Sequence, residues 1–169
     1  MSMLTPDQQA MSAIWQQHAH AEFVLKDADA ALATMTEDPY VFLVASGVAG
    51  IGRAALRELY ATKFLPNLPA DLEITSLSQT FGADRFVEEM VMRFTHDIVM
   101  DWLLPGLQPT GRSATCALAC VVLFRGDKIA AEHLYWDQAT LLLQLGVPGH
   151  PIAAADIASV TKLLKLQTQ

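Results

Sequence analysis

Asp137 is the first candidate for chemistry, because it follows a mostly apolar segment, 129–136, that is predicted to form a β-strand. A carboxyl group in a dry site has a raised pKa, and it can then take a proton from a carbon acid or activate a water near pH 7. Since side chains of a strand alternate between its faces, His133, Tyr135 and Asp137 share one face. Alternatively, Asp137 caps a helix that begins at Gln138, a common role of aspartate. The sequence is compatible with both roles.

His18 and Glu22 lie one helical turn apart in a segment, 6–25, whose apolar residues recur at helical spacing. They share the apolar side of the predicted helix with Trp15, so each polar group needs a partner in the interior. They form either a buried hydrogen bond that fixes the helix or part of a pocket. A zinc site made of His18, His20 and Glu22 is excluded, because His20 points to another side of the helix.

Ionisable residues also interrupt the segment 86–96, which is otherwise typical of a core strand. Alternation along this strand places His96 and Glu89 on opposite faces, so only one of them can face a pocket. The next segment, 101–111, is rich in proline and glycine and contains Trp102. Such a segment suits a lid or one end of a cavity, and it can equally be an ordered connection.

The order of the elements that must position these residues predicts an α+β fold. Three helices are expected first, over 6–25, 27–36 and 53–65, with a strand at 40–45 before the third. Four long strands follow, at 72–81, 86–96, 114–124 and 129–136. Short turns between them favour antiparallel neighbours. A short helix at 138–145 and a terminal helix near 152–166 complete the chain.

The charge and hydropathy of the chain exclude several classes of function. The 169 residues carry a net charge of −7 and contain no basic cluster, so we expect no nucleic-acid partner. The longest nearly apolar run, 114–124, is much shorter than the roughly 20 residues of a membrane helix. The first residues lack a secretory signal, and we therefore expect a cytoplasmic protein with no membrane partner. Cys116 and Cys120 would lie about 13 Å apart in a strand, beyond the reach of a disulfide.

Two further patterns concern assembly and phosphate binding. The strand 114–124 is apolar on both faces, so a helix or a second copy of the chain must cover the second face, and we expect a homodimer. The run 47–52 contains three glycines but lacks the lysine and Ser/Thr of a phosphate-binding loop. It is interpreted as a glycine-rich loop with positive φ angles.

Several short motifs occur in one order along the chain: Thr95-His96, the run PGLQPTGR at 105–112, Lys128-Ile129, the run EHLYWDQ at 132–138, and the run LLQLG at 142–146. With these motifs the chain resembles the SnoaL-like polyketide cyclases of the nuclear transport factor 2-like superfamily. The resemblance implies a single domain, 1–169, with a core at about 8–147 and a helical extension at 148–169. It also implies a cone-shaped, curved, mainly antiparallel sheet that wraps around N-terminal helices and encloses a deep apolar pocket.

The superfamily includes cofactor-free cyclases, ketosteroid isomerases, epoxide hydrolases and noncatalytic binding modules, so fold alone does not decide function. In the SnoaL-like cyclases an aspartate late in the sheet is the acid/base, and the matching residue is Asp137. We therefore predict an enzyme without cofactor or metal that acts on a small apolar carbonyl or epoxide compound, with His96 as hydrogen-bond partner of Asp137 or of the substrate. The predicted substrate contacts are Trp15, His18, Glu89, Trp102 and Tyr135. The alternatives are a noncatalytic domain that binds a small hydrophobic ligand and a dimeric assembly module with a filled pocket.

Overall fold

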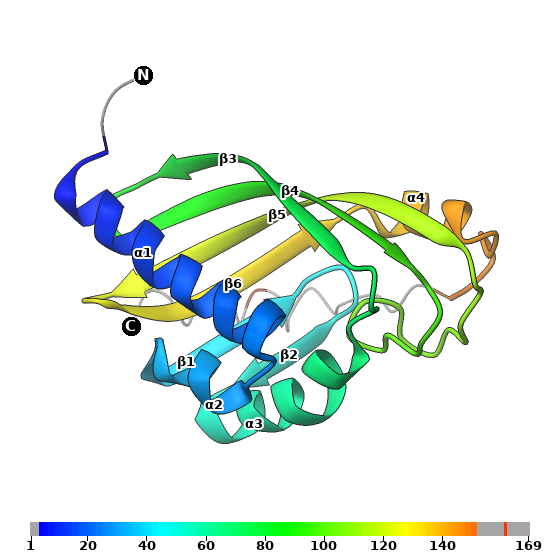
Figure 1. The fold of residues 1–169 in the computed structure, drawn as a ribbon, viewed down its shortest axis with the longest axis horizontal. Coiled ribbons are helices and arrows are strands. Elements are labelled where there is room, and N and C mark those ends of the chain that lie inside the picture. Colours follow the sequence, from blue (N-terminus) through cyan, green and yellow to red (C-terminus); the bar gives the residue numbers. More distant parts are fainter. Residues whose placement is uncertain (1–3, 152–160, 162–169) are drawn as a thin grey trace.

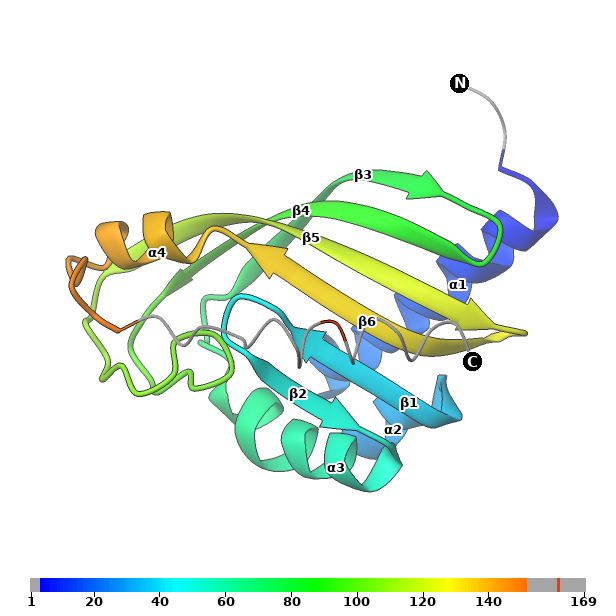
Figure 2. The same ribbon diagram turned by 180° about the vertical axis from the view of Figure 1, so that it is seen from behind.

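The structure is a computed structural model that describes residues 4–151 and Thr161. Within these residues the strands are β1 (Met35–Leu43), β2 (Val48–Ile51), β3 (Glu73–Phe81), β4 (Arg85–Thr95), β5 (Ser113–Arg125) and β6 (Lys128–Trp136). They form one sheet in the order β2-β1-β6-β5-β4-β3, in which only β1 and β6 run parallel to each other. The sheet is curved, and the N-terminal helices lie against one of its faces (Figures 1 and 2). The predicted α+β fold with a mainly antiparallel sheet is confirmed.

The first helix, α1 (Pro6–His20), begins where the sequence predicts it. The Thr5 side chain accepts a hydrogen bond from the Gln8 N–H, and the Gln8 side chain accepts one from the Thr5 N–H. This reciprocal cap satisfies two backbone donors at the helix start. The helix continues as a π-helical segment, η1 (Ala21–Leu25), and the chain then turns at Lys26 with φ 51°. The helix predicted over 6–25 is confirmed, and its last five residues are π-helical rather than α-helical.

The other N-terminal helices are also short and interrupted. Asp27 caps α2 (Ala28–Ala33) by accepting hydrogen bonds from backbone N–H groups. The predicted third helix consists of α3 (Arg53–Glu58), a π-helical segment η2 (Leu59–Phe64) and a 3₁₀ turn η3 (Leu65–Asn67). Apolar side chains of these segments are buried and form the wall of the interior that faces the sheet.

The glycine-rich run 47–52, expected to be a loop, contains the short strand β2, which pairs with β1. A Cβ at Gly50 would lie 2.7 Å from Leu56 Cδ2, so glycine allows the strand to approach α3. Strand β1 itself begins at Met35, earlier than predicted, because its pairing with β6 already starts opposite Ile129. The early start of β1 depends on pairing with β6, which is distant in sequence, and local sequence does not report such pairing.

The two faces of the sheet carry different apolar clusters. The inner face packs against the helices, and Cys120 and Val122 of β5 belong to that core. The outer face carries a smaller cluster of Tyr40, Phe42, Leu123 and Ala131. Both cysteines are free and buried. Strand β5 thus contributes buried side chains to both faces, and the homodimer inferred from its pattern stays a prediction.

At one end of the sheet lies α4 (Gln138–Gln144), close to the long connection 96–112 (Figure 1). The predicted helix at 138–145 is confirmed to within one residue. The predicted helix at 152–166 lies outside the described residues, apart from Thr161, which is helical. Within the described part of the chain, every helix is too short or too polar to cross a membrane.

Candidate functional site

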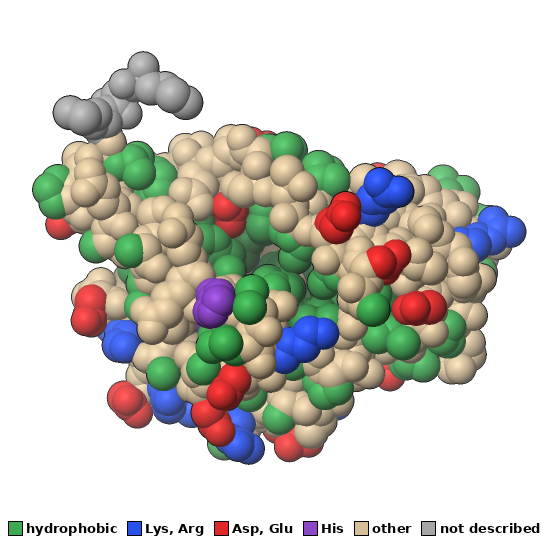
Figure 3. Space-filling model, viewed as in Figure 1, with side chains coloured by type: hydrophobic (Ala, Val, Ile, Leu, Met, Phe, Trp, Pro, Cys, Tyr) green, Lys and Arg blue, Asp and Glu red, His purple; other side chains and the backbone are tan. Residues whose placement is uncertain are grey.

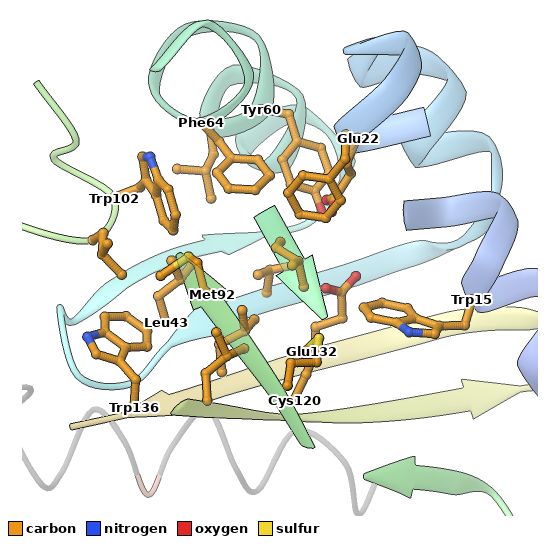
Figure 4. A pocket seen from close by; sticks show the side chains of 18 residues that line it. Trp15, Glu22, Leu43, Tyr60, Phe64, Met92, Trp102, Cys120, Glu132 and Trp136 are labelled. Carbon is orange, nitrogen blue, oxygen red and sulfur yellow. The ribbon is translucent and has the colours of Figure 1, made fainter. Parts of the chain in front are cut away.

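A cavity opens between the inner face of the sheet and the helices. Figure 3 shows it as a hollow walled mostly by hydrophobic side chains. The space inside it that a water-sized molecule can reach is about 70 Å³, and a volume of about 810 Å³ results only when all gaps between atoms and the space open to solvent are included. The lining side chains labelled in Figure 4 are Trp15, Glu22, Leu43, Tyr60, Phe64, Met92, Trp102, Cys120, Glu132 and Trp136. The acidic side chains of Glu22 and Glu132 lie at one end of the cavity, beside Tyr60 and Trp15, and the rings of Phe64, Trp102 and Trp136 form the other end, so the two ends suit different parts of a ligand.

His18 is fully buried behind the acidic end of the cavity. Because the Thr34 hydroxyl donates to Ala31 O at 2.6 Å, His18 Nδ1 is the donor in its 2.6 Å contact with Thr34 Oγ1. On the other side of the ring, Nε2 lies 3.1 Å from Glu22 Oε1 and 3.0 Å from Glu132 Oε1. Burial by itself lowers the pKa of His18, but the charges of Glu132 and Glu22 outweigh it and raise that pKa well above 6.5.

Glu132 is the carboxylate on the sheet side of this cluster and is 3% exposed. From β6 it points toward Tyr60 and Glu22 (Figure 4). The His18 Nε2–H is aligned on Glu22, so Glu132 Oε1 has no hydrogen bond among the described residues although it lies close to the imidazole. Burial raises the pKa of Glu132, and the charge of His18 opposes that rise. A buried carboxyl group with an unused acceptor atom at a cavity wall is a candidate acid or base.

Tyr60 brings a hydroxyl group to the same end of the cavity from η2. Its oxygen lies 3.4 Å from His18 Nε2. Burial raises the pKa of Tyr60, and the nearby carboxylates of Glu132 and Glu22 raise it further. The hydroxyl therefore keeps its proton, which faces Glu22, and a ligand oxygen would compete with that carboxylate for the hydrogen bond.

The opposite end of the cavity is aromatic. Phe64 and Trp102 meet edge to face, with ring centroids 5.0 Å apart. The indole N–H of Trp102 donates to Asn67 O at 3.2 Å, and that of Trp136 donates to Gln138 Oε1 at 2.5 Å. Because both N–H groups are used by the protein, the rings present carbon to the cavity, and this end suits the apolar part of a ligand.

Trp15 forms the wall beside the acidic cluster and is held on two sides. Its indole N–H donates to Glu88 Oε2 at 2.6 Å, and its ring stacks on His18 with a centroid distance of 5.8 Å. Glu88 also accepts from Ser76 Oγ at 2.6 Å and from Gln79 Nε2 at 3.0 Å. These three hydrogen bonds make Glu88 a positioning residue for Trp15, because its acceptors are already used.

Three of the predicted contact residues are at the cavity. Trp15 and Trp102 line it, and His18 is hydrogen-bonded to Glu22 at its acidic end. The two interpretations of His18 and Glu22 therefore hold together, since the buried pair is also part of the pocket wall.

Asp137 lies elsewhere, exposed at the start of α4. Its carboxylate accepts hydrogen bonds from the Thr140 N–H at 3.0 Å and the Thr140 hydroxyl at 2.5 Å. Both hydrogen bonds lower the pKa of Asp137, and the one from the Thr140 hydroxyl has the larger effect. The helix-cap interpretation accounts for this residue, and its position gives no support to the acid/base role predicted for it.

His96 lies directly after β4 and is buried, but it does not line the cavity. Its Nδ1 accepts from the Thr110 N–H at 3.4 Å, and its Nε2 has no partner within residues 4–151 and Thr161. Burial lowers the pKa of His96. The predicted catalytic contact of His96 with a ligand in the cavity therefore has no support in its position either.

Glu89 and Tyr135 are both exposed, on the face of the sheet opposite the cavity. Glu89 accepts a hydrogen bond from Ser78 Oγ at 2.6 Å. Side chains alternate between the two faces of a strand, and the preceding Glu88 and the following Trp136 point inward. Glu89 and Tyr135 therefore point outward. The predicted contacts of Glu89 and Tyr135 with a substrate are not compatible with this placement.

Sequence reasoning missed Glu132 and Tyr60 as site residues. A signal for Glu132 was present, because it shares its strand parity with the large apolar side chains of Leu134 and Trp136. Tyr60 sits on the apolar stripe of the third helix and carries no distinguishing local pattern.

No family model matches the sequence, and neither does any curated protein. Solved structures are similar in fold. One is a putative SnoaL-like polyketide cyclase from Jannaschia sp. CCS1, 14% identical, with a TM-score of 0.68 over 89% of this chain and 100% of that chain. Another is a hypothetical protein with a ketosteroid isomerase-like fold from Catenulispora acidiphila DSM 44928, 18% identical, with a TM-score of 0.62 over 86% of this chain and 96% of that chain.

A third is the epoxide hydrolase/cyclase-like enzyme SalBIII, which is 16% identical, with a TM-score of 0.58 over 81% of this chain and 97% of that chain. At such identities the similarity concerns the fold, because unrelated functions share this architecture. The implied cone-shaped architecture is confirmed, and the chain has the fold of the SnoaL-like and nuclear transport factor 2-like proteins.

Proposed function

We propose that this protein is an enzyme that, without a cofactor, moves a proton on a small apolar carbonyl or epoxide compound held in the cavity. The observation that carries the proposal is Glu132 Oε1, a buried carboxylate oxygen at the cavity wall that has no hydrogen bond among the described residues. Such a group is available to take a proton from a bound molecule or to give one to it. Proteins of similar fold described as cyclase, ketosteroid isomerase-like or epoxide hydrolase/cyclase-like support this range of reactions.

Glu132 is the acid/base of the proposed reaction. As a carboxylate it removes a proton from the carbon next to a carbonyl group, and the same proton returns to another atom of the product. As a carboxylic acid it donates its proton to an epoxide oxygen while a water or a hydroxyl group of the same compound attacks the epoxide carbon and the C–O bond breaks, and the proton lost by that nucleophile returns to the carboxylate. The Tyr60 hydroxyl stabilises the developing oxyanion by donating a hydrogen bond. His18 is a positioning residue, 3.0 Å from Glu132 Oε1.

The two ends of the cavity orient the substrate. The reacting oxygen lies at the end formed by Tyr60 and Glu132, and the apolar part lies between Trp102 and Trp136 (Figure 4). Apolar walls exclude water from the reacting group, which strengthens the electrostatic interactions at the acidic end. We therefore expect affinity to rise with the apolar area of the ligand.

The test combines binding and turnover. All three tryptophans of the chain line the cavity, so their fluorescence reports ligand binding directly. In a panel of small cyclic ketones and epoxides, Glu132→Gln is expected to keep binding within a few-fold while kcat falls by roughly 10²–10⁴. The matched control is Glu89→Gln, a change of the same chemistry on the opposite face of the sheet. Turnover by Glu132→Gln at the wild-type rate would overturn the proposal.

A noncatalytic ligand-binding domain is the second candidate. It is favoured by the position of Asp137, since the residue matched to the cyclase acid/base is exposed and has a lowered pKa. Tryptophan fluorescence changes on ligand addition, with no turnover of any bound compound, would support this candidate over the enzyme. A dimeric assembly module stays a third candidate, because the space that a water-sized molecule can reach in the cavity is only about 70 Å³.

A further inference from the structure

The acidic end of the cavity brings three metal-ligand atoms together: His18 Nε2, Glu22 Oε1 and Glu132 Oε1. The nitrogen lies 3.1 Å and 3.0 Å from the two oxygens, and one ligand atom from each side chain lies within 4.8 Å of the others. Neighbouring ligand atoms of a tetrahedral zinc ion are about 3.3 Å apart, given bonds of about 2.0–2.1 Å. We infer that His18, Glu22 and Glu132 bind a divalent metal ion of the Zn²⁺ class, with one coordination position open toward the cavity.

The unused oxygen of Glu132 is the second, independent observation. His18 has a single Nε2–H, which is aligned on Glu22, so Glu132 Oε1 is buried without an aligned hydrogen bond in the described part of the chain, although the imidazole nitrogen lies 3.0 Å away. One proton on Nε2 cannot serve two carboxylates. A cation placed between the three atoms would satisfy both carboxylates and the imidazole at once, and a buried carboxylate otherwise retains a desolvation cost.

The surroundings of His18 suit a metal ligand. Its Nδ1–H donates to Thr34 Oγ1, with Ala31 O 3.2 Å away, which fixes the tautomer and leaves Nε2 as the coordinating atom. Metal-binding histidines typically have their other N–H held in this way. The stacked ring of Trp15 further restricts the imidazole.

The donor set selects the type of ion. One imidazole and two carboxylates suit Zn²⁺ and other divalent first-row ions, whereas Cu⁺ prefers sulfur ligands. Three protein ligands with a fourth position free are typical of reactive zinc sites rather than structural ones. Here the free position would face Tyr60 and the cavity.

His18 Nε2 cannot hold a proton and a metal ion at the same time. Coordination by Nε2 displaces its proton, so about one proton is released for each ion bound. Glu132 becomes a ligand in that state and is no longer free to act as acid or base. The inference therefore goes beyond the proposed function and does not depend on it, and Zn²⁺ is expected to inhibit any turnover that uses Glu132.

The test uses Co²⁺ and Zn²⁺ with purified protein that has been treated with a chelator, without any substrate. We expect Co²⁺ to develop visible absorption bands of a tetrahedral site, and Zn²⁺ to abolish them by displacement. Calorimetry in buffers of different ionisation enthalpy is expected to report about one proton released per ion. In Glu132→Gln and Glu22→Gln we expect affinity to fall by ~100-fold or more, whereas exposed His20→Gln on the same helix keeps it.

Circular dichroism checks that each variant is folded, and the wild-type titration stays decisive where a variant unfolds. Failure of the wild type to bind Co²⁺ or Zn²⁺ below about 1 mM would overturn the inference, as would full affinity in folded Glu132→Gln. An active protein that binds neither ion refutes this inference alone. If the protein binds Zn²⁺ through these residues but shows no turnover, the metal-site inference is supported and the proposed enzymatic function is refuted.

Discussion

Glu132 and Asp137 lie close together in sequence, at the interior and just past the end of β6, yet their surroundings are opposite. Glu132 faces the cavity, and burial raises its pKa. Asp137 is exposed, and hydrogen bonds from Thr140 lower its pKa. Because side chains alternate along a strand, Glu132 shares the inner face with Trp136, while Asp137 follows where the strand has ended. The comparison teaches that strand parity and burial, rather than residue type, decide which carboxylate is available for chemistry.

Removing His18 from the buried cluster is expected to destabilise the protein most. His18→Ala leaves Glu22 and Glu132 buried without their cation, and the free energy of unfolding is expected to fall by about 3–5 kcal/mol. Urea denaturation followed by circular dichroism measures the change. His20→Ala, on the exposed side of α1, is the control and should change stability by less than about 0.5 kcal/mol. Equal effects of the two variants would show that the cluster is not a buried ionic unit.

A smaller effect is expected at Asp137. Asp137→Ala removes the cap of α4 and is expected to lower the free energy of unfolding measurably, though by less than His18→Ala, as thermal or urea unfolding would show. Asp137→Asn should retain most of that stability, because asparagine is also a good helix cap. Neither change should alter turnover or ligand affinity. Loss of turnover in folded Asp137→Asn would restore the acid/base role and reverse the comparison.

The smallest effect is expected for an exposed ion pair. Arg57 contacts both Asp29 oxygens, at 2.8 and 2.9 Å, but both side chains are well exposed. Asp29→Asn should therefore change the free energy of unfolding very little, because solvent screens the pair, and the small effect should shrink further as salt is added. A loss similar to that of His18→Ala would mean that burial does not separate the two kinds of charge contact.

Elements with strong local signals were predictable from the sequence. The Thr5 cap, the Asp27 cap and the long alternating strands appear close to where local chemistry places them. Strand β2 was not predictable, because pairing with β1 overrides the loop tendency of its glycines. The inner and outer faces of β4 and β6 were also undecided locally, and Glu89 and Tyr135 were expected on the wrong face.

The order of the elements, the fold class and the shared buried side of His18 and Glu22 can be read from the sequence, because they follow from caps, turns and periodicity within a few residues. Only the tertiary structure decided that Glu132 joins that pair and that Asp137 does not. The curved sheet carries β6 across to α1, so residues far apart in the chain meet in one buried site. The interaction energy of these buried side chains depends on their burial and on charges from distant segments, and neither can be read from a local sequence pattern.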